Sequence, residues 1–245
     1  MGEAAVRDQD AIAGILKGLA GGPARGARDF WRRLCARMRD DRPLAKICGI
    51  TNRDDAELAV ELGADMIGFV FADSPRKADA VLVRELADLD VLKVAVVVTG
   101  GEHGGLSDEV RGLLDEGLID AVQFHGDEKP DECAAQAFPY YKAVRLGEAA
   151  GAGVIAEYRS PRVLVDARDS RAYGGTGKQL SPEIVAAAAD VRPLWLAGGL
   201  SDENIGKVAS MYRPELVDVS SGLEAAPGRK DPVRMRRFFT ELRYE

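Results

Sequence analysis

The amino-acid sequence predicts an α/β protein: a (β/α)8 barrel of the TIM type with an N-terminal helical extension. Three observations predict this fold. Eight short apolar runs follow residue 43, amphipathic stretches separate most of them, and the 245-residue chain has room for one barrel-sized domain. Several runs are apolar at successive positions, as in strands buried on both faces of a parallel sheet. This alternation indicates a closed barrel, and a doubly wound open sheet is the alternative with the same periodicity.

The eight runs are rich in Val, Ile and Phe, and each is short enough to be one strand. They are Leu44–Cys48, Asp65–Phe71, Leu92–Val98, Asp120–His125, Tyr140–Arg145, Arg162–Ala167, Leu194–Ala197 and Leu216–Ser220. Between them, apolar residues recur at helical spacing. The clearest faces are Ala56, Ala59, Val60 and Gly63, then Leu106, Val110, Leu113 and Leu114, and finally Val233, Met235, Phe238, Phe239 and Leu242. The fifth helix has the weakest pattern, because Gly147–Gly153 is rich in Gly and Ala.

Composition argues against several classes of protein. Apolar residues make up 46% of the chain, which argues against disorder, and no apolar run approaches the roughly 20 residues of a membrane-spanning helix. No secretory signal is visible, and the three widely spaced cysteines, Cys35, Cys48 and Cys133, favour a reducing compartment over a disulfide framework. Zinc-like Cys/His spacing is absent, and the net charge of −7 disfavours nucleic acid. We therefore expect a cytoplasmic protein without membrane, nucleic-acid or metal partners.

Residues 1–43 differ from the rest of the chain. They hold nine basic and six acidic residues, so this segment carries +3 and the remainder −10. Two helical stripes lie in it, one formed by Ile12, Ile15, Leu16 and Leu19 and one by Phe30, Trp31, Leu34, Cys35 and Met38. We predict two units, a helical extension at 1–43 that packs on the barrel and a catalytic barrel at 44–245, and we expect deletion of the extension to leave the chemistry intact. A partner-binding arm and an artefact of start-site choice at Met38 are the alternatives.

Candidate catalytic residues lie where predicted strands end, because barrel active sites form at the C-terminal ends of the strands. Cys48 ends the first strand and becomes a general base if its thiolate is accessible. Asp166 closes an apolar strand, where burial would favour a general acid. Arg76 follows the second strand and can bind a carboxylate through two parallel hydrogen bonds. Gln123 and His125 point to the same side of the fourth strand. Taken alone, each residue also fits a structural role.

Glycine-rich turns follow strands six, seven and eight. They contain Gly174, Gly175, Thr176 and Gly177, then Gly198 and Gly199, and then Ser220, Ser221 and Gly222. Glycines let backbone N–H groups approach phosphate oxygens, and barrels commonly bind phosphate after strands seven and eight. Three such turns at these places favour a phosphate cradle, a site where backbone N–H groups bind a phosphate, over glycines that only form ordinary turns. The sequence therefore predicts acid–base chemistry on a sugar phosphate.

These motifs resemble the phosphoribosylanthranilate isomerase family of tryptophan biosynthesis. The similar stretches are KICGIT at Lys46–Thr51, SPR at Ser74–Arg76, VQFHGDE at Val122–Glu128, GGTG at Gly174–Gly177, LAGGL at Leu196–Leu200, VDVSSG at Val217–Gly222 and PGRKD at Pro227–Asp231. They occur in order at predicted strand ends from Leu44 to the C-terminus. The loop after the third strand departs from the family pattern, because Thr99 and Gly100 stand where an Asn-like ending is expected, and Phe124 replaces a common Leu.

The resemblance implies an Amadori rearrangement of N-(5-phosphoribosyl)anthranilate to 1-(2-carboxyphenylamino)-1-deoxyribulose 5-phosphate. It implies that Asp166 is the general acid and Cys48 the general base. Arg76 would hold the anthranilate carboxylate and Asp218 would bind near the anthranilate end. The three glycine-rich loops would hold the phosphate. No metal or cofactor is implied, and relatives include monomers and homodimers.

Other readings stay open. A histidine-pathway phosphoribosyl isomerase, or a bifunctional enzyme, uses the same barrel and a second glycine-rich phosphate loop, for which Gly100, Gly101, Gly104 and Gly105 are candidates. Cys48 argues against the single histidine-pathway activity, because that family resembles this one but has Asp there. A non-catalytic barrel scaffold, with residues 1–43 as a contact arm, and a fragment of a longer bifunctional chain are further alternatives.

Overall fold

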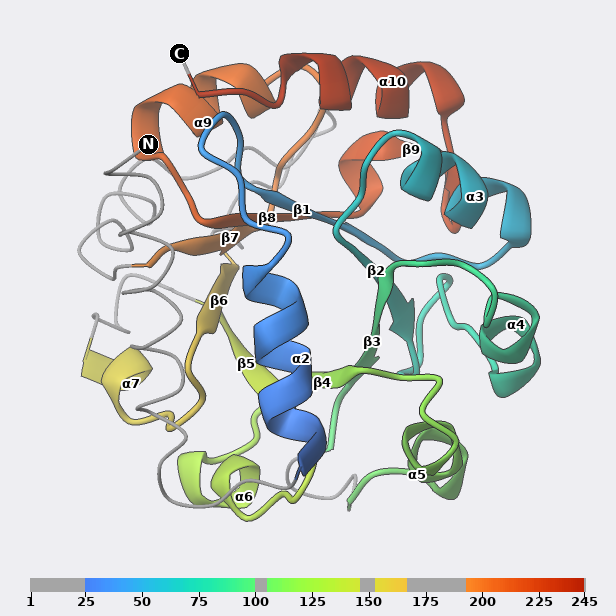
Figure 1. Cartoon of the computed structure of the whole chain (residues 1–245), viewed down its shortest axis with the longest axis vertical. Helices are drawn as coiled ribbons and strands as arrows, with labels where there is room; N and C mark the ends of the chain where they lie inside the picture. Colours follow the sequence, from blue (N-terminus) through green and yellow to red (C-terminus); the bar gives the residue numbers. More distant parts are fainter. Residues whose placement is uncertain (1–24, 100–104, 146–152, 167–192, 245) are drawn as a thin grey trace.

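A computed structural model describes residues 25–99, 105–145, 153–166 and 193–244. Eight parallel strands close into a barrel in sequence order (Figure 1). The strands are β1 Leu44–Cys48, β2 Met66–Val70, β3 Leu92–Val97, β4 Ala121–Phe124, β5 Tyr140–Arg145, β6 Val163–Asp166, β7 Trp195–Ala197 and β8 Leu216–Val219. The helices described are α2 Arg25–Cys35, α3 Arg53–Glu61, α4 Ala80–Glu85, α5 Asp108–Asp115, α6 Pro130–Ala134, α7 Gly153–Ala156, α9 Ile205–Tyr212 and α10 Pro232–Glu241.

The predicted barrel is confirmed, and closure excludes the open sheet. Strand β1 pairs in parallel with both β2 and β8, with Lys46 opposite Asp218 in the second pairing. The predicted ends of each strand agree with the observed ends to within one residue, because each apolar run stops where the chain leaves the barrel wall. After β8 the chain adds the short helix η2 Ser221–Leu223 and a hairpin of β9 Glu224–Ala226 and β10 Arg229–Lys230.

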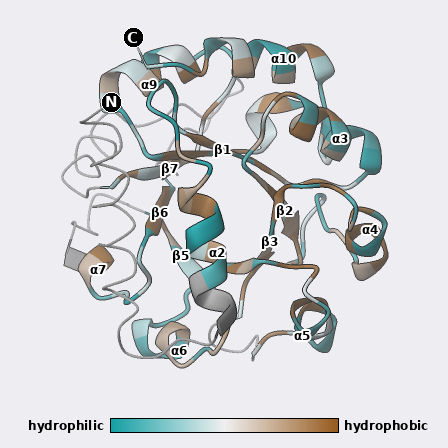
Figure 2. Cartoon of the chain, in the orientation of Figure 1, coloured by the Kyte–Doolittle hydropathy of each residue, from teal (hydrophilic) through white to brown (hydrophobic). Residues whose placement is uncertain are grey.

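The barrel wall separates two apolar cores, because successive strand side chains point to opposite faces. Outward residues such as Ile47 and Val217 pack under the surrounding helices. Inward residues such as Leu44, Met66 and Leu216 fill the barrel at the N-terminal ends of the strands. In Figure 2 the strand ribbons are mostly brown, whereas α3, α4 and α10 also carry teal, polar positions. Among the described residues, the charged side chains of Lys46 and Asp218 lie inside the barrel on the C-terminal side of this apolar layer.

Side-chain caps fix where the surrounding helices begin. Asn52, Asp79, Ser107 and Asp231 each accept a hydrogen bond from a backbone N–H in the first turn of the following helix. The helical face predicted for the last helix was wrong at one residue, because Val233 is 75% exposed. Val233 precedes the buried Met235 by two positions, which places it about 200° around the helix from the packed face.

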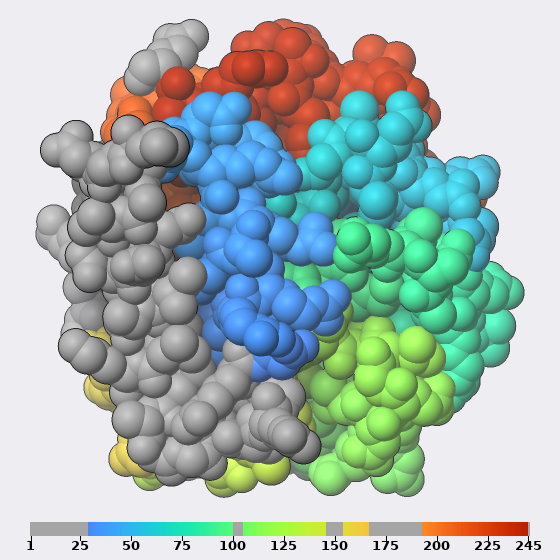
Figure 3. Space-filling model, in the orientation of Figure 1, coloured from blue at the N-terminus to red at the C-terminus, as the bar shows by residue number. Residues whose placement is uncertain are grey.

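Helix α2 lies across the N-terminal end of the barrel. Figure 1 looks onto this end with α2 in front of the strands, and in Figure 3 its atoms cover the middle of that face. Phe30, Trp31, Leu34 and Cys35 are buried among the first residues of the strands. Trp31 contacts Trp195 of β7, with ring centroids 5.8 Å apart. The second predicted stripe of the extension therefore forms the barrel floor, and the stripe at residues 12–19 lies outside the described residues.

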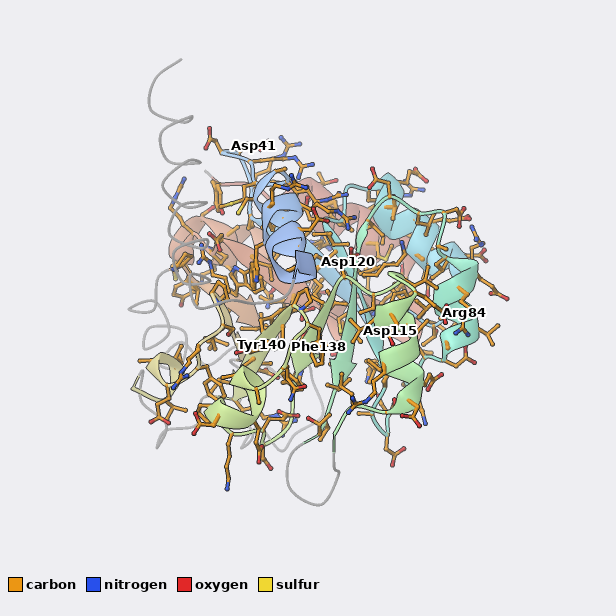
Figure 4. All side chains as sticks on the ribbon, turned by 60° about the horizontal axis from the view of Figure 1, so that its bottom comes forward. Asp41, Arg84, Asp115, Asp120, Phe138 and Tyr140 are labelled. Carbon is orange, nitrogen blue, oxygen red and sulfur yellow. The ribbon has the colours of Figure 1, made fainter. Side chains whose placement is uncertain are left out.

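Polar contacts hold α2 beside the barrel wall. Arg33 pairs with Asp120, which stands directly before β4 and is labelled beside α2 in Figure 4. After α2, Arg39 and Arg42 both donate to the buried carboxylate of Asp65, at 2.8 and 2.9 Å. The helix is thus fixed by apolar packing in the centre and by ion pairs at its edges. The division of the chain at residue 43 stays a prediction.

Candidate active site

Predicted site residues from four strands meet at the C-terminal mouth of the barrel. Cys48 is the last residue of β1 and Asp166 the last of β6, and both point inward because they lie at even spacing from inward residues of the same strands. One pocket is lined by Cys48, Gln123, His125, Asp166, Ala197, Gly198, Gly199, Leu200, Asp218, Val219, Ser220, Ser221 and Gly222. Side chains that are far apart in sequence therefore face one small volume, at the end of the barrel opposite α2.

The Cys48 thiol borders this pocket while being 9% exposed. Burial raises the pKa of Cys48 above its usual value, because a thiolate is poorly solvated there. Lys46 opposes this rise, Asp218 adds to it and Lys230 again opposes it, each through its charge. The surroundings thus place positive charge next to the sulfur and offset part of the rise in pKa that burial causes.

His125 connects the acid candidate to the barrel interior. Its Nε2 lies 3.5 Å from Oδ2 of Asp166, and its Nδ1 lies 2.9 Å from Nε2 of Gln123. Oε1 of Gln123 accepts from Lys46 and Tyr141, so the amide NH2 group faces the histidine and donates to Nδ1, which favours the tautomer with the proton on Nε2. Asp166 is itself 5% exposed. The predicted side-by-side orientation of Gln123 and His125 is confirmed by this contact.

A buried lysine that the sequence analysis did not single out lies beneath the thiol. Nζ of Lys46 donates to Oδ2 of Asp218 at 2.6 Å and to Oε1 of Gln123 at 2.8 Å. The same Oε1 accepts from the hydroxyl of Tyr141 at 2.9 Å. The available signal was a charged residue inside the otherwise apolar run Leu44–Cys48. A lysine is almost never fully buried unless it is paired, so its position predicts a carboxylate nearby.

Asp218 has one carboxylate oxygen engaged and one without a partner. Oδ2 holds Lys46, whereas Oδ1 is buried and, within the described residues, accepts no hydrogen bond. Asp218 lines the pocket, and a buried acceptor without a donor is costly. The site therefore offers an unused acceptor beside Cys48.

Arg76 lies at the edge of the site and is held by Glu224 of β9. Its Nε and Nη2 donate to the two oxygens of Glu224 at 2.8 and 2.7 Å, which is a bidentate fork. Lys230 of β10 donates to Oε1 of Glu224 at 3.1 Å and to the carbonyl of Cys48 at 2.7 Å. Arg76 does not line the pocket that holds Cys48, but it packs against the next residue: a Cβ on Gly49 would lie 2.9 Å from its Cδ. Glu224 and Lys230 were not predicted.

Two of the three predicted phosphate loops are described. Gly198 and Gly199 have φ of +88° and +69°, a region that favours glycine. A Cβ at Gly222 would lie 1.9 Å from the carbonyl oxygen of Leu200, so only glycine allows the β8 loop to pack on the β7 loop. Ser220, Ser221 and both glycine turns line the pocket with Cys48. The stretch Gly174–Gly177 lies outside the described residues.

Neither a metal centre nor a membrane span emerges from the described parts of the chain. No group of three or more His, Cys, Asp or Glu side chains there is arranged to hold a metal ion. No helix among those residues has the length and apolar character needed to cross a membrane.

Comparison with known proteins decides the family. The family described as N-(5'phosphoribosyl)anthranilate (PRA) isomerase matches residues 45–241. The chain belongs to this family. Its match begins at the first strand and ends in α10, so it includes the barrel and excludes α2. The resemblance inferred from the motifs is confirmed.

Individual isomerases of the family are similar along nearly their whole length. The N-(5'-phosphoribosyl)anthranilate isomerase of Geobacter metallireducens is 41% identical over 195 residues, 79% of this chain and 95% of that protein. The dimeric phosphoribosylanthranilate isomerase of Thermotoga maritima, crystallised as mutually generated monomers, is 32% identical with a TM-score of 0.68, covering 82% of this chain and 98% of that one. A second structure, also 32% identical with a TM-score of 0.62 and the same coverage, is an isomerase in complex with reduced 1-(o-carboxyphenylamino)-1-deoxyribulose 5-phosphate.

Proposed function

We propose that this protein catalyses the Amadori rearrangement of N-(5-phosphoribosyl)anthranilate, with Asp166 as general acid and Cys48 as general base. The observation that carries the proposal is the single pocket lined by Cys48, Asp166 and the glycine-rich loops after β7 and β8. An acid, a base and a phosphate cradle within one volume are what this isomerisation needs. Membership of the isomerase family supports the same substrate.

The proposed reaction begins with two proton transfers, and its final tautomerisation adds a proton to C1 and removes one from the C2 hydroxyl. Asp166 gives its proton to the furanose ring oxygen, the ring C–O bond breaks, and the nitrogen lone pair forms a Schiff base with C1. The thiolate of Cys48 then takes the proton from C2, and the C2–H electrons pass through the Schiff base to give an enolamine. Tautomerisation of the enolamine yields the ketone. His125, 3.5 Å from Asp166, can hold the carboxyl group in position for the first transfer.

Substrate contacts follow from unused donors and acceptors. Glu224 accepts from Nε and Nη2 of Arg76, which leaves the Nη1 donors for the anthranilate carboxylate. Oδ1 of Asp218 is the acceptor for the anthranilate N–H, because it is buried and has no partner among the residues that the structure describes. Backbone N–H groups at Gly198, Gly199, Ser220, Ser221 and Gly222, together with Gly174, Gly175, Thr176 and Gly177, would bind the phosphate.

The decisive experiment follows the loss of phosphoribosylanthranilate fluorescence with the purified wild-type chain and with Cys48→Ser and Asp166→Asn. We expect each variant to lower kcat by orders of magnitude while a phosphate-bearing product analogue still binds. A wild-type rate in either variant would exclude the assigned acid–base pair. Absence of turnover by a folded wild-type protein would exclude the isomerase and support a non-catalytic barrel.

Two further measurements determine which substrates the protein turns over and in which oligomeric state it acts. The histidine-pathway aminoaldose substrate is run alongside, and we expect no turnover because Cys48 stands at the end of β1. Turnover of both substrates would establish a bifunctional enzyme. We further propose that the protein acts in the cytoplasm on a small phosphosugar, as a monomer or homodimer, which light scattering at assay concentrations distinguishes.

A further inference from the structure

Lys46 occupies the centre of the barrel directly under the catalytic mouth. It is fully buried, and its Nζ is held by Oδ2 of Asp218 and Oε1 of Gln123. Lys46 and Asp218 are register partners on neighbouring strands, so the backbone itself places them side by side. Burying an ion pair costs desolvation energy, and an apolar pair often serves the fold as well. The pair therefore calls for a role other than stability.

Lys46 and the Cys48 sulfur both pack closely against Gly68. Gly68 of β2 is the register partner of Cys48, and its lack of a side chain lets both groups approach its Cα. A Cβ on Gly68 would lie 3.0 Å from Sγ of Cys48, 3.0 Å from Cε of Lys46 and 3.1 Å from Nζ of Lys46. The ammonium and the sulfur thus both lie beside the same glycine.

Several charged or titratable groups surround the thiol. They are Lys46 on β1, Arg76 after β2, Tyr141 on β5, Asp218 on β8 and Lys230 on β10, together with the pocket neighbours His125 and Asp166. Among the charges that act on Cys48, Lys46 has the largest influence and Asp218 the next, with opposite sign. The two members of one buried ion pair therefore shift the pKa of the thiol in opposite directions: Lys46 lowers it and Asp218 raises it.

We propose that Lys46 is a positioning residue for the isomerisation, which holds Asp218 and Gln123 in place and stabilises the thiolate of Cys48 through its ammonium charge. The inference rests on the proposed role of Cys48 as the base. Lys46 touches no substrate, because it lies below the pocket lining. It acts on the reaction through the sulfur above it and through the acceptor that it orients on Asp218.

The proposal predicts opposite effects at the two ends of the pair. Lys46→Met removes the positive charge, so the pKa of Cys48 rises further and less thiolate is present at neutral pH. Asp218→Asn removes the negative charge and keeps the shape, so the pKa of Cys48 falls and more thiolate is present. A purely structural pair would predict the same direction in both variants, because each breaks the same contact.

The test measures alkylation of Cys48 by iodoacetamide from pH 6 to 10, with mass spectrometry to separate Cys48 from Cys35 and Cys133. At neutral pH we expect Lys46→Met to slow the alkylation of Cys48 about tenfold, the effect of one pKa unit, and Asp218→Asn to accelerate it. Lys142→Met is the matched control, since Lys142 is also a buried strand lysine paired to a carboxylate, Glu128 at 3.2 Å. The control is expected to leave the pH midpoint of Cys48 unchanged.

Shifts of the same sign in Lys46→Met and Asp218→Asn, or no shift in either, would overturn the proposal. If Lys46→Met does not fold, the sign of the Asp218→Asn shift still decides. Isomerase kinetics separate this inference from the proposed function. With an active wild type, the acid limb of the kcat profile moves to higher pH in Lys46→Met and KM changes little. If the wild type shows no isomerase activity but the alkylation shifts occur, the proposed function fails and the electrostatic role of Lys46 stands.

Discussion

At the scale of single residues, Glu224 determines which donors Arg76 can present. The carboxylate holds Nε and Nη2 at 2.8 and 2.7 Å, and Lys230 holds the carboxylate in turn. We expect Glu224→Gln to raise KM about tenfold with a smaller change in kcat. The Arg76 side chain would no longer be held in one orientation toward the substrate, while Cys48 and Asp166 stay in place. Steady-state kinetics measure this split. A fall in kcat without a change in KM would contradict the role of Arg76 in substrate binding.

Glu224 also predicts a pH dependence of stability. Burial disfavours the charged carboxylate, but Arg76 and Lys230 outweigh it and hold the pKa of Glu224 below its usual value of 4.5. A lowered folded-state pKa adds stability above the unfolded-state value, and this stability is lost as pH falls through the folded-state value. We expect the free energy of unfolding to drop below about pH 4.5 more steeply in the wild type than in Glu224→Gln. Urea denaturation across pH 3–7 checks it, and parallel curves would contradict it.

Gly222 gives a steric prediction at the same scale. A methyl group there would overlap the carbonyl oxygen of Leu200, so Gly222→Ala must displace the β8 loop from the β7 loop. We expect Gly222→Ala to weaken inorganic phosphate binding at least tenfold and to lower Tm. Gly112→Ala, on α5, is the control, because a Cβ there meets only the flexible end of Glu116 at 3.9 Å. Equal phosphate affinity in Gly222→Ala and the wild type would exclude this loop from the cradle.

At the scale of elements, α2 functions as part of the barrel rather than as an appendage. Trp31 is 1% exposed and contacts Trp195, while Leu34 and Cys35 pack on the same floor. We expect Trp31→Ala to destabilise the protein by roughly 3–5 kcal/mol in urea denaturation, with kcat of the folded variant unchanged. Arg32→Ala is the control, because the Arg32 side chain is 73% exposed. A marginal effect of Trp31→Ala would show that α2 docks weakly.

The elements also show why prediction worked for the fold and stopped short of the site. Strand limits followed from apolar runs, and the ends of strands placed Cys48 and Asp166 at one mouth. Lys46, Glu224 and Lys230 were missed because their meaning lies in partners remote in sequence: Asp218 lies across the β1–β8 seam from Lys46. Spacing along one strand predicts which face of the sheet a residue lies on, but not which charged residue of a neighbouring strand it will contact. Those contacts follow only from the strand pairing in the closed barrel.

At the scale of the whole molecule, stability and chemistry occupy opposite ends of one barrel. The N-terminal end is closed by α2 and apolar side chains, and the C-terminal end carries the pocket. Between them lies the polar layer of Lys46, Gln123 and Tyr141, and Tyr141 also contacts Trp195 on the floor, with ring centroids 5.1 Å apart. This layer therefore connects the floor to the site through side-chain contacts.

The composition of the floor also determines what the intrinsic fluorescence of the protein measures. Both tryptophans of the chain, Trp31 and Trp195, lie there in contact, and the Trp195 indole N–H donates to Glu215 at 2.7 Å. Intrinsic emission therefore records the docking of α2, while the anthranilate chromophore of the proposed substrate would report from the far mouth. Tryptophan emission and anthranilate emission can be followed in one sample at separate wavelengths. A variant in which α2 docks less tightly is therefore distinguished, in the same sample, from a variant that has lost turnover.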